Sequence, residues 1–284
     1  MGLDISNVDG SFAIEVSGVD LRTPLSDEDF AAIRDAWFHS GVMVIRDQHL
    51  SPSEQVAFSR RFGELGIHVL DQFAHPEQKE VLVLSNKKHP DGSAVGFEDA
   101  GRYWHSDLSY MEKPMLGTML LAIEIPPEGG DTHFADMRAA LATLPAETRE
   151  RIEGRRAFHS YTRDQKAKES VEGMRPILSE EQAAKVPDVV HPIIRTHEDT
   201  SEKALFINHG FTFAVEDIED EDGKELLGAL FAHATQPKLI YVHKWQPHDF
   251  LCWDNRIVMH HATTYDTKYT RHMHRTTIEG GVPV

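Results

Sequence analysis

The sequence predicts a mostly antiparallel β core with helices packed on its outside, arranged as one domain over residues 1–284. Two observations lead to this fold class. From residue 189 onward, apolar runs rich in β-branched and aromatic residues recur between turn residues, as the strands of a β core do. Earlier in the chain, helical periodicity is confined to a few segments with clear start and stop residues. We find no repeat, low-complexity tract or linker that would divide the chain.

The composition is that of an ordinary globular protein, with 40% hydrophobic and 26% charged residues. The net charge of −17 disfavours binding to nucleic acid or anionic membranes, which carry the same sign of charge. No apolar run is long enough to span a bilayer, and the N-terminal "MGLDISNVDG" lacks the pattern of a signal peptide. Cys252 is the only cysteine, so no intrachain disulfide can form. These features predict a cytoplasmic protein with no nucleic-acid or membrane partner.

The first expected elements are a strand or hairpin at 12–21, a helix and a buried strand. The helix lies within "PLSDEDFAAIRDAWFHSG", where Ser26 suits the capping position and Gly41 suits the stop. The strand "VMVIRD" follows directly.

A second helix is expected from Ser51 to a point near Gly63. Pro52 suits its first helical position, and Glu54 stands where it completes a capping box with Ser51. This is a strong local signal for a helix start.

The remaining chain alternates short strands with helices. Asp136 is a capping residue, and two helices are expected after it, at 137–143 and 146–154. Irregular stretches at 64–102 and 162–188 are candidate lids, because long structureless segments in compact proteins are often functional. The other expected elements are a helix near 222–234 and strands within "VLVLSN", "MLGTMLLAIEI", "VVHPIIRTH", "ALFINH", "KLIYVHKW", "DFLCWDN", "RIVMHHAT" and "HRTTIEGG".

A candidate metal site begins in "YWHSDLSY", residues 103–110. On a strand, His105 and Asp107 would point to the same face, because side chains alternate. His260 and His261 are candidates for a third ligand, and on a strand only one of them can face the site. Two histidines and one carboxylate suit non-haem Fe(II) that activates O2, although zinc accepts the same ligands.

Arg271 and Arg275 are candidates for binding a carboxylate. They are four residues apart, so on a strand they share a face. A guanidinium pairs with a carboxylate through two parallel hydrogen bonds. The alternative is a pair of surface arginines in an acidic protein.

Taken together, these segments resemble the Fe(II)- and 2-oxoglutarate-dependent dioxygenases of the taurine dioxygenase / 2,4-dichlorophenoxyacetate dioxygenase (TauD/TfdA) family. The resemblance covers nearly the whole chain, in a specific order. It rests on "GVDLRTPLS", "AFSRRFGEL", "WHSDLSY", "PPEGGDTHFADM", "HPIIRTH", "ALFINHGFT", "FAHATQPK", "WDNRIVMHHA" and "RHMHRTT". It implies a double-stranded β-helix, or jelly roll, with flanking helices.

The resemblance also implies roles for individual residues. His105 and Asp107 match the family's His-x-Asp, and His260 matches its distal histidine, so that His261 would point away. These three residues would bind iron.

Three further residues match the family's cosubstrate contacts. Thr132 matches a threonine that holds the distal carboxylate of 2-oxoglutarate, and Arg271 matches the arginine paired with that carboxylate. Arg275 matches the arginine near the inner carboxylate of the cosubstrate and near the substrate anion.

The activity implied is hydroxylation of an unactivated C–H bond in a small organic anion, with O2 consumed and succinate and CO2 released. "FADMRAAL", "MHHATTYD" and "HRTT" are closer to the branch that cleaves aryloxyacetates, which favours an aryloxyalkanoate substrate resembling 2,4-dichlorophenoxyacetate. Relatives of this kind are often dimers or tetramers, so the resemblance implies a homo-oligomer.

Substrate contacts are less defined. His68 matches a histidine that grips taurine in taurine-specific members, while Asp71 and Gly101 replace a tyrosine and an asparagine of that group. Tyr161 and Phe211 match aromatic positions that line the pocket. These departures disfavour taurine itself.

Other functions stay open at this stage. Within the family, the substrate could be a sulfonate or an alkyl sulfate, and the reaction could be desaturation or isonitrile formation. Outside it, a zinc hydrolase would use the same three ligands but gives Thr132 and Arg271 no task. A non-catalytic binding protein of the same fold would have no need of an intact ligand set.

Overall fold

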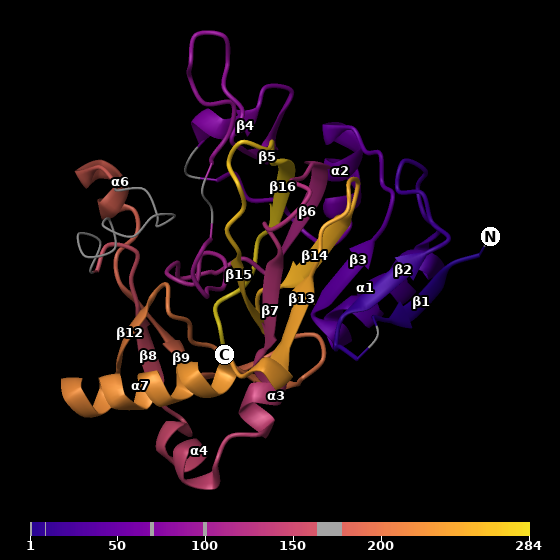
Figure 1. Cartoon of the computed structure of the whole chain (residues 1–284). Helices are drawn as coiled ribbons and strands as arrows, with labels where there is room; N and C mark the ends of the chain where they lie inside the picture. Colours follow the sequence, from indigo (N-terminus) through magenta and orange to yellow (C-terminus); the bar gives the residue numbers. More distant parts are fainter. Residues whose placement is uncertain (1, 9, 69–70, 99–100, 164–177) are drawn as a thin grey trace.

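The computed structural model describes residues 2–8, 10–68, 71–98, 101–163 and 178–284 (Figure 1). Its largest sheet is antiparallel throughout, except that β2 pairs with β3 in parallel. Within the described residues the strands run in the order β1 (Asp4–Asn7), β2 (Ile14–Ser17), β3 (Val42–Ile45), β14 (Phe250–Asp254), β6 (Gly117–Glu124), β16 (His272–Ile278), β5 (Gln78–Ser85) and β4 (Ala74–His75). The predicted antiparallel β core is confirmed.

A smaller sheet faces the centre of the large one. Its strands are β13 (Ile240–His243), β7 (Thr132–Asp136) and β15 (Val258–Ala262), all antiparallel. Apolar side chains of both sheets form one core, in which the ring of Phe134 lies 5.6 Å from that of Trp253. Two facing antiparallel sheets of this kind are the expected double-stranded β-helix.

Two further small sheets extend the fold, and the three-stranded one lies next to α7 (Asp220–Ala234) (Figure 1). They contain β12 (Thr212–Val215), β8 (Arg156–His159) and β9 (Val189–Pro192) in one, and β10 (Ile194–Thr196) and β11 (Lys203–Leu205) in the other. β8 and β12 were not expected from the sequence. Each is only four residues long and shows no clear alternation of apolar and polar residues. They are recognised as strands through their pairing with one another, which a local sequence pattern does not reveal.

The helix starts agree with the predicted capping residues. α1 (Asp27–Ser40) is capped by Ser26, whose hydroxyl accepts from the backbone N–H of Asp29, and Gly41 ends it with φ 85°. α2 (Pro52–Ser59) has the expected capping box, although it ends earlier than Gly63. The others are α3 (Met137–Ala142), α4 (Ala146–Ile152) and α6 (Glu180–Ala184).

The expectation of irregular structure over 162–188 is wrong in part, because α6 lies there. Its signal was present in the sequence, since Ser179 and Gln182 form a capping box. Residues 69–70, 99–100 and 164–177 lie outside the described residues, so the lid role stays a prediction. None of the described helices combines the length and the apolar character needed to cross a membrane.

The outer face of the large sheet is covered by α1 and α2. Phe30, Ile33 and Trp37 of α1 and Phe58 of α2 belong to a second core cluster built against this face. Gly117 at the start of β6 lies beneath Trp37, and a Cβ atom there would be 2.6 Å from the indole ring. Close packing at this point therefore requires glycine.

We predict opposite effects for two Gly→Ala substitutions. Gly117→Ala overpacks a buried contact and should lower the free energy of unfolding by about 1–3 kcal/mol. Gly228→Ala is the matched control, because Gly228 is exposed in α7 and a Cβ there meets no atom within 4 Å. It should raise stability by about 0.5–1 kcal/mol. Urea unfolding of both variants measures the difference, and equal effects would contradict the packing described.

Candidate metal and cosubstrate site

Three potential metal ligands meet between the two facing sheets. His105, Asp107 and His260 are buried, and one ligand atom of each lies within 4.8 Å of the others. His105 Nε2 is 3.6 Å from Asp107 Oδ1, and His260 Nε2 is 3.9 Å from Asp107 Oδ2. The structure thus brings together the three residues that the sequence singled out.

The local geometry differs from the strand expected for His-x-Asp. His105 forms a single antiparallel bridge with His260, through backbone N···O distances of 2.9 and 2.8 Å. Asp107 already belongs to a turn, in which Leu108 has a positive φ of 55°. The turn, rather than strand alternation, directs the carboxylate toward the two imidazoles.

The protonation states suit metal binding. The carbonyl oxygen of Tyr103 can only accept, so His105 Nδ1 donates to it at 2.8 Å, and Nε2 is the ring nitrogen that faces Asp107. Burial raises the pKa of Asp107, but Arg275 and His260 outweigh it and hold the pKa well below the usual range. Burial and the neighbouring His105 lower the pKa of His260 well below its usual value. The site therefore holds a carboxylate and a neutral imidazole at neutral pH.

His261 points away from this cluster. Its ring packs edge-on against Trp104 with 4.5 Å between centroids, and it faces His133 across the strand pair. Because neighbouring residues on β15 face opposite sides, only His260 reaches the interior.

The expected cosubstrate residues line the same cavity as the three ligands. This cavity of about 40 Å³ is bordered by Thr132, Arg271 and Arg275, besides His105, Asp107 and His260. The indole N–H of Trp245 donates to the hydroxyl of Thr132 at 3.0 Å. That hydroxyl keeps its own proton for an acceptor in the cavity. Arg275 Nη2 lies 3.0 Å from Asp107 Oδ1.

Gly101 is required at the wall of the site. It has φ +79°, and a Cβ atom would lie 2.7 Å from Cε1 of His105. A side chain there, such as the asparagine of the taurine-specific group, would displace the imidazole in this arrangement.

Aromatic side chains form the neighbouring wall. Tyr110, Tyr161 and Phe211 pack together, with ring centroids 4.7–6.2 Å apart. Phe211 lies 6.3 Å from the ring of His105, and Tyr103 lies 4.9 Å from it. Tyr110 and Tyr161 also line a second cavity of about 560 Å³.

Two further positions bear on the substrate: His68, a predicted contact, and Asp71, which replaces the tyrosine of taurine-specific members. Asp71 lines the larger cavity, together with Lys185 and Glu181. His68 is largely buried, and its pKa falls to about 4 through burial and the charge of Arg275, against the opposing effect of Asp107. His68 is therefore neutral at pH 7.

The sequence reasoning gave no role to Tyr103, Tyr110 and Trp245. Tyr103 and Tyr110 flank the His-x-Asp stretch, so their proximity to the site could have been inferred. Trp245 lies 113 residues from Thr132, and only the pairing of β13 with β7 brings them together.

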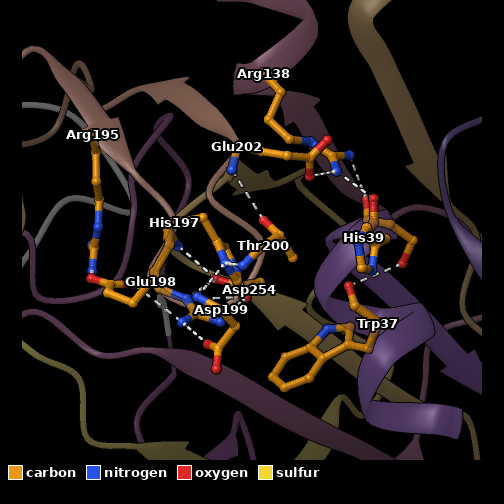
Figure 2. A network of polar contacts seen from close by, with 12 residues as sticks. Trp37, His39, Arg138, Arg195, His197, Glu198, Asp199, Thr200, Glu202 and Asp254 are labelled. Carbon is orange, nitrogen blue, oxygen red and sulfur yellow. Dashed lines mark hydrogen bonds and ion pairs between the residues drawn. The ribbon is translucent and has the colours of Figure 1, made fainter.

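A buried ionic network supports the turn between β14 and β15, the strand of His260. His197 Nδ1 accepts from the backbone N–H groups of Asp199 and Thr200, so its Nε2–H donates to Asp254 at 3.0 Å (Figure 2). Arg256 Nη2 lies 2.6 Å from Asp254 Oδ2, and Arg256 Nη1 lies 2.7 Å from Asp199. The network joins the 197–200 loop to the turn.

Comparisons with known proteins identify the family of this chain. The family described as "Taurine catabolism dioxygenase TauD, TfdA family" matches residues 4–277. An alpha-ketoglutarate-dependent 2,4-dichlorophenoxyacetate dioxygenase of Cupriavidus pinatubonensis is 34% identical over 275 residues, which cover 94% of each chain. An (S)-phenoxypropionate/alpha-ketoglutarate-dioxygenase of Sphingobium herbicidovorans is 32% identical, covering 98% of this chain and 95% of that one. The crystal structure of AAD-2 in complex with Mn(II) and N-oxalylglycine is 31% identical with TM-score 0.83, covering 100% and 99% of the two chains.

The chain therefore belongs to the TauD/TfdA family, and it is a 2-oxoglutarate-dependent dioxygenase that uses Fe(II), 2-oxoglutarate and O2. The described residues fit the metal. One ligand atom of each residue lies within 4.8 Å of the other two, so the three side chains converge on a position for one ion. Two imidazole nitrogens and one carboxylate are the donor set of non-haem Fe(II) oxygenases.

We predict that Asp254 stabilises the fold in a pH-dependent manner. Burial raises its pKa, but Arg256 and His197 lower it more, and the net result is a pKa well below the usual carboxyl range. A carboxyl group whose pKa is lower in the folded state stabilises the folded protein at pH values above its unfolded-state pKa of about 4. This contribution is lost as the pH falls through the folded-state pKa. Asp254→Asn should therefore cost about 3–5 kcal/mol at pH 7, because it leaves Arg256 without its buried partner.

Urea unfolding from about pH 7 to pH 3 tests this prediction, and the loss should shrink toward acid. Asp266→Asn is the control, because Asp266 forms an exposed pair with Lys268 and its removal should change stability little. A deficit in Asp254→Asn that is the same at every pH would contradict the ionic role.

Proposed function

We propose that this chain hydroxylates an aryloxyalkanoate or a closely similar aryl-bearing organic anion, with iron held by His105, Asp107 and His260. The observation that carries the proposal is the convergence of these three ligands with an arginine-lined cavity and an aromatic wall. Family membership supplies the reaction class, and the aromatic wall supports the choice of substrate.

The cosubstrate is bound by Thr132, Arg271 and Arg275 in this proposal. Thr132 donates its hydroxyl proton to the distal carboxylate of 2-oxoglutarate, because its lone pair already accepts from Trp245. Arg271 pairs with that carboxylate, and Arg275 lies next to the metal ligands, where the inner carboxylate binds. When bound, the iron supplies the oxidative chemistry that converts 2-oxoglutarate and O2 to succinate and CO2 while hydroxylating the substrate.

The aryl group is proposed to lie against Tyr110, Tyr161 and Phe211. Aromatic rings pack favourably edge-on or offset against one another, and this wall is next to His105. The acid group of the substrate would bind near Arg275 and His68. Because His68 is neutral at pH 7, Arg275 provides the positive charge and His68 a hydrogen bond.

Sulfonates and alkyl sulfates are the second candidate substrates. His68, which matches a taurine contact, favours them, while the requirement for glycine at position 101 argues against the taurine-specific arrangement. Desaturation or isonitrile formation would use the same iron ligands. The homo-oligomeric state, the cytoplasmic location and the single domain of residues 1–284 remain predictions.

The ligand assignment predicts different effects for adjacent histidines. His260→Ala should abolish Mn(II) binding measured by titration calorimetry, because it removes one of three ligands. His261→Ala is its matched control on the same strand and should bind Mn(II) as the wild type does, since its ring faces Trp104. The reverse pattern would show that His261 is the ligand.

The substrate proposal predicts succinate production stimulated by aryloxyalkanoates. We would measure succinate from 2-oxoglutarate under air, with Fe(II) and ascorbate, across aryloxyalkanoates, sulfonates, alkyl sulfates and amino acids. Strongest stimulation by an aryloxyalkanoate, with release of the corresponding phenol, is the expected result. Stimulation by sulfonates alone would select the second candidate, and turnover unaffected by any compound would reject both substrate classes.

A further inference from the structure

A buried threonine donates a hydrogen bond to the carboxylate of Asp107. Thr118 on β6 is fully buried, and its hydroxyl donates to Asp107 Oδ2 at 2.7 Å. Asn255, 1% exposed at the turn after β14, contacts both residues. Its Nδ2 lies 3.1 Å from Thr118 Oγ1, and its Oδ1 accepts from the backbone N–H of Asp107 at 3.2 Å.

The direction of each hydrogen bond follows from the donors available. The backbone N–H of Asp107 can only donate, so the side-chain oxygen of Asn255 faces it and the amide NH2 faces Thr118. A hydroxyl has one proton, and Thr118 already accepts from Asn255. Its proton is therefore directed to Asp107 Oδ2.

The two oxygens of Asp107 consequently have different surroundings. Oδ2 accepts the short hydrogen bond from Thr118 and lies 3.9 Å from His260 Nε2. Oδ1 lies 3.6 Å from His105 Nε2 and 3.0 Å from Arg275 Nη2. A carboxylate held at one oxygen in this way cannot rotate freely. Hydrogen-bond partners of metal-binding groups commonly set ligand orientation in this way.

We propose that Thr118 and Asn255 are positioning residues that hold the Asp107 carboxylate in the orientation in which it would bind the metal together with His105 and His260. This inference rests on the proposed function, because it takes Asp107 as a ligand. Asn255 is itself fixed, since its backbone N–H donates to the carbonyl oxygen of Leu116 and its neighbours Asp254 and Arg256 belong to the buried ionic network.

The test measures metal binding rather than turnover. Thr118→Val keeps the shape of the side chain and removes the hydroxyl. It should weaken Mn(II) binding about 10- to 100-fold in titration calorimetry. It should also change the visible absorption of the Co(II)-loaded protein, which reports coordination number and geometry. Thr118→Ser retains the hydroxyl and should restore both readouts. Thr118→Ala removes the same hydroxyl with a smaller side chain, so the comparison does not depend on the folding of one variant.

Thr276→Val is the matched control. Thr276 is also fully buried, and its hydroxyl bonds to Ser59 at 2.7 Å instead of to a ligand. It should lower the melting temperature but leave Mn(II) affinity and the Co(II) spectrum unchanged.

Two outcomes would overturn this inference and leave the proposed iron site standing. In the first, the wild type binds Mn(II) and Thr118→Val binds it with the same affinity. In the second, Thr118→Val and Thr276→Val lose the same amount of Mn(II) affinity. A wild type that binds no metal would overturn the proposed iron site as well.

Discussion

The candidate site depends on one backbone interaction, the antiparallel bridge between His105 and His260. Its two hydrogen bonds, with N···O distances of 2.9 and 2.8 Å, join residues that are 155 positions apart in the sequence. The bridge sets the imidazole rings side by side, with 4.2 Å between centroids. Because the backbone hydrogen bonds fix the spacing of the two residues, their imidazole rings extend from neighbouring backbone positions.

Charge compensation then permits a carboxylate to stay ionised in a buried place. Burial alone raises the pKa of Asp107, and Arg275 together with His260 reverses that effect. The same burial keeps His260 and His68 neutral at pH 7. The site thus combines a carboxylate and the neutral imidazole of His260, which suit a cation, with the positive charge of Arg275, beside which we propose that acid groups bind.

The turn between β14 and β15 supports these ligands. Asp254, Arg256 and His197 form a buried network at the turn that also carries Asn255, and Asn255 contacts the backbone of Asp107. Asp254 and Arg256 are two residues apart, whereas the contacts of His197 with Asp254 and of Asn255 with Asp107 join distant segments. A site assembled in this manner is sensitive to changes in the turn, although the turn itself provides no metal ligand.

The sequence by itself determined the elements whose signals are local. Ser26 and Gly41 bound a helix, and the Ser51 capping box starts another, because the groups that satisfy these helix ends lie within a few residues. Family resemblance selected His260 over His261. Only the tertiary structure decided that a turn directs Asp107 and that Thr118 contacts it. Such contacts join distant segments, and their geometry follows from strand pairing and sheet packing that no local pattern encodes.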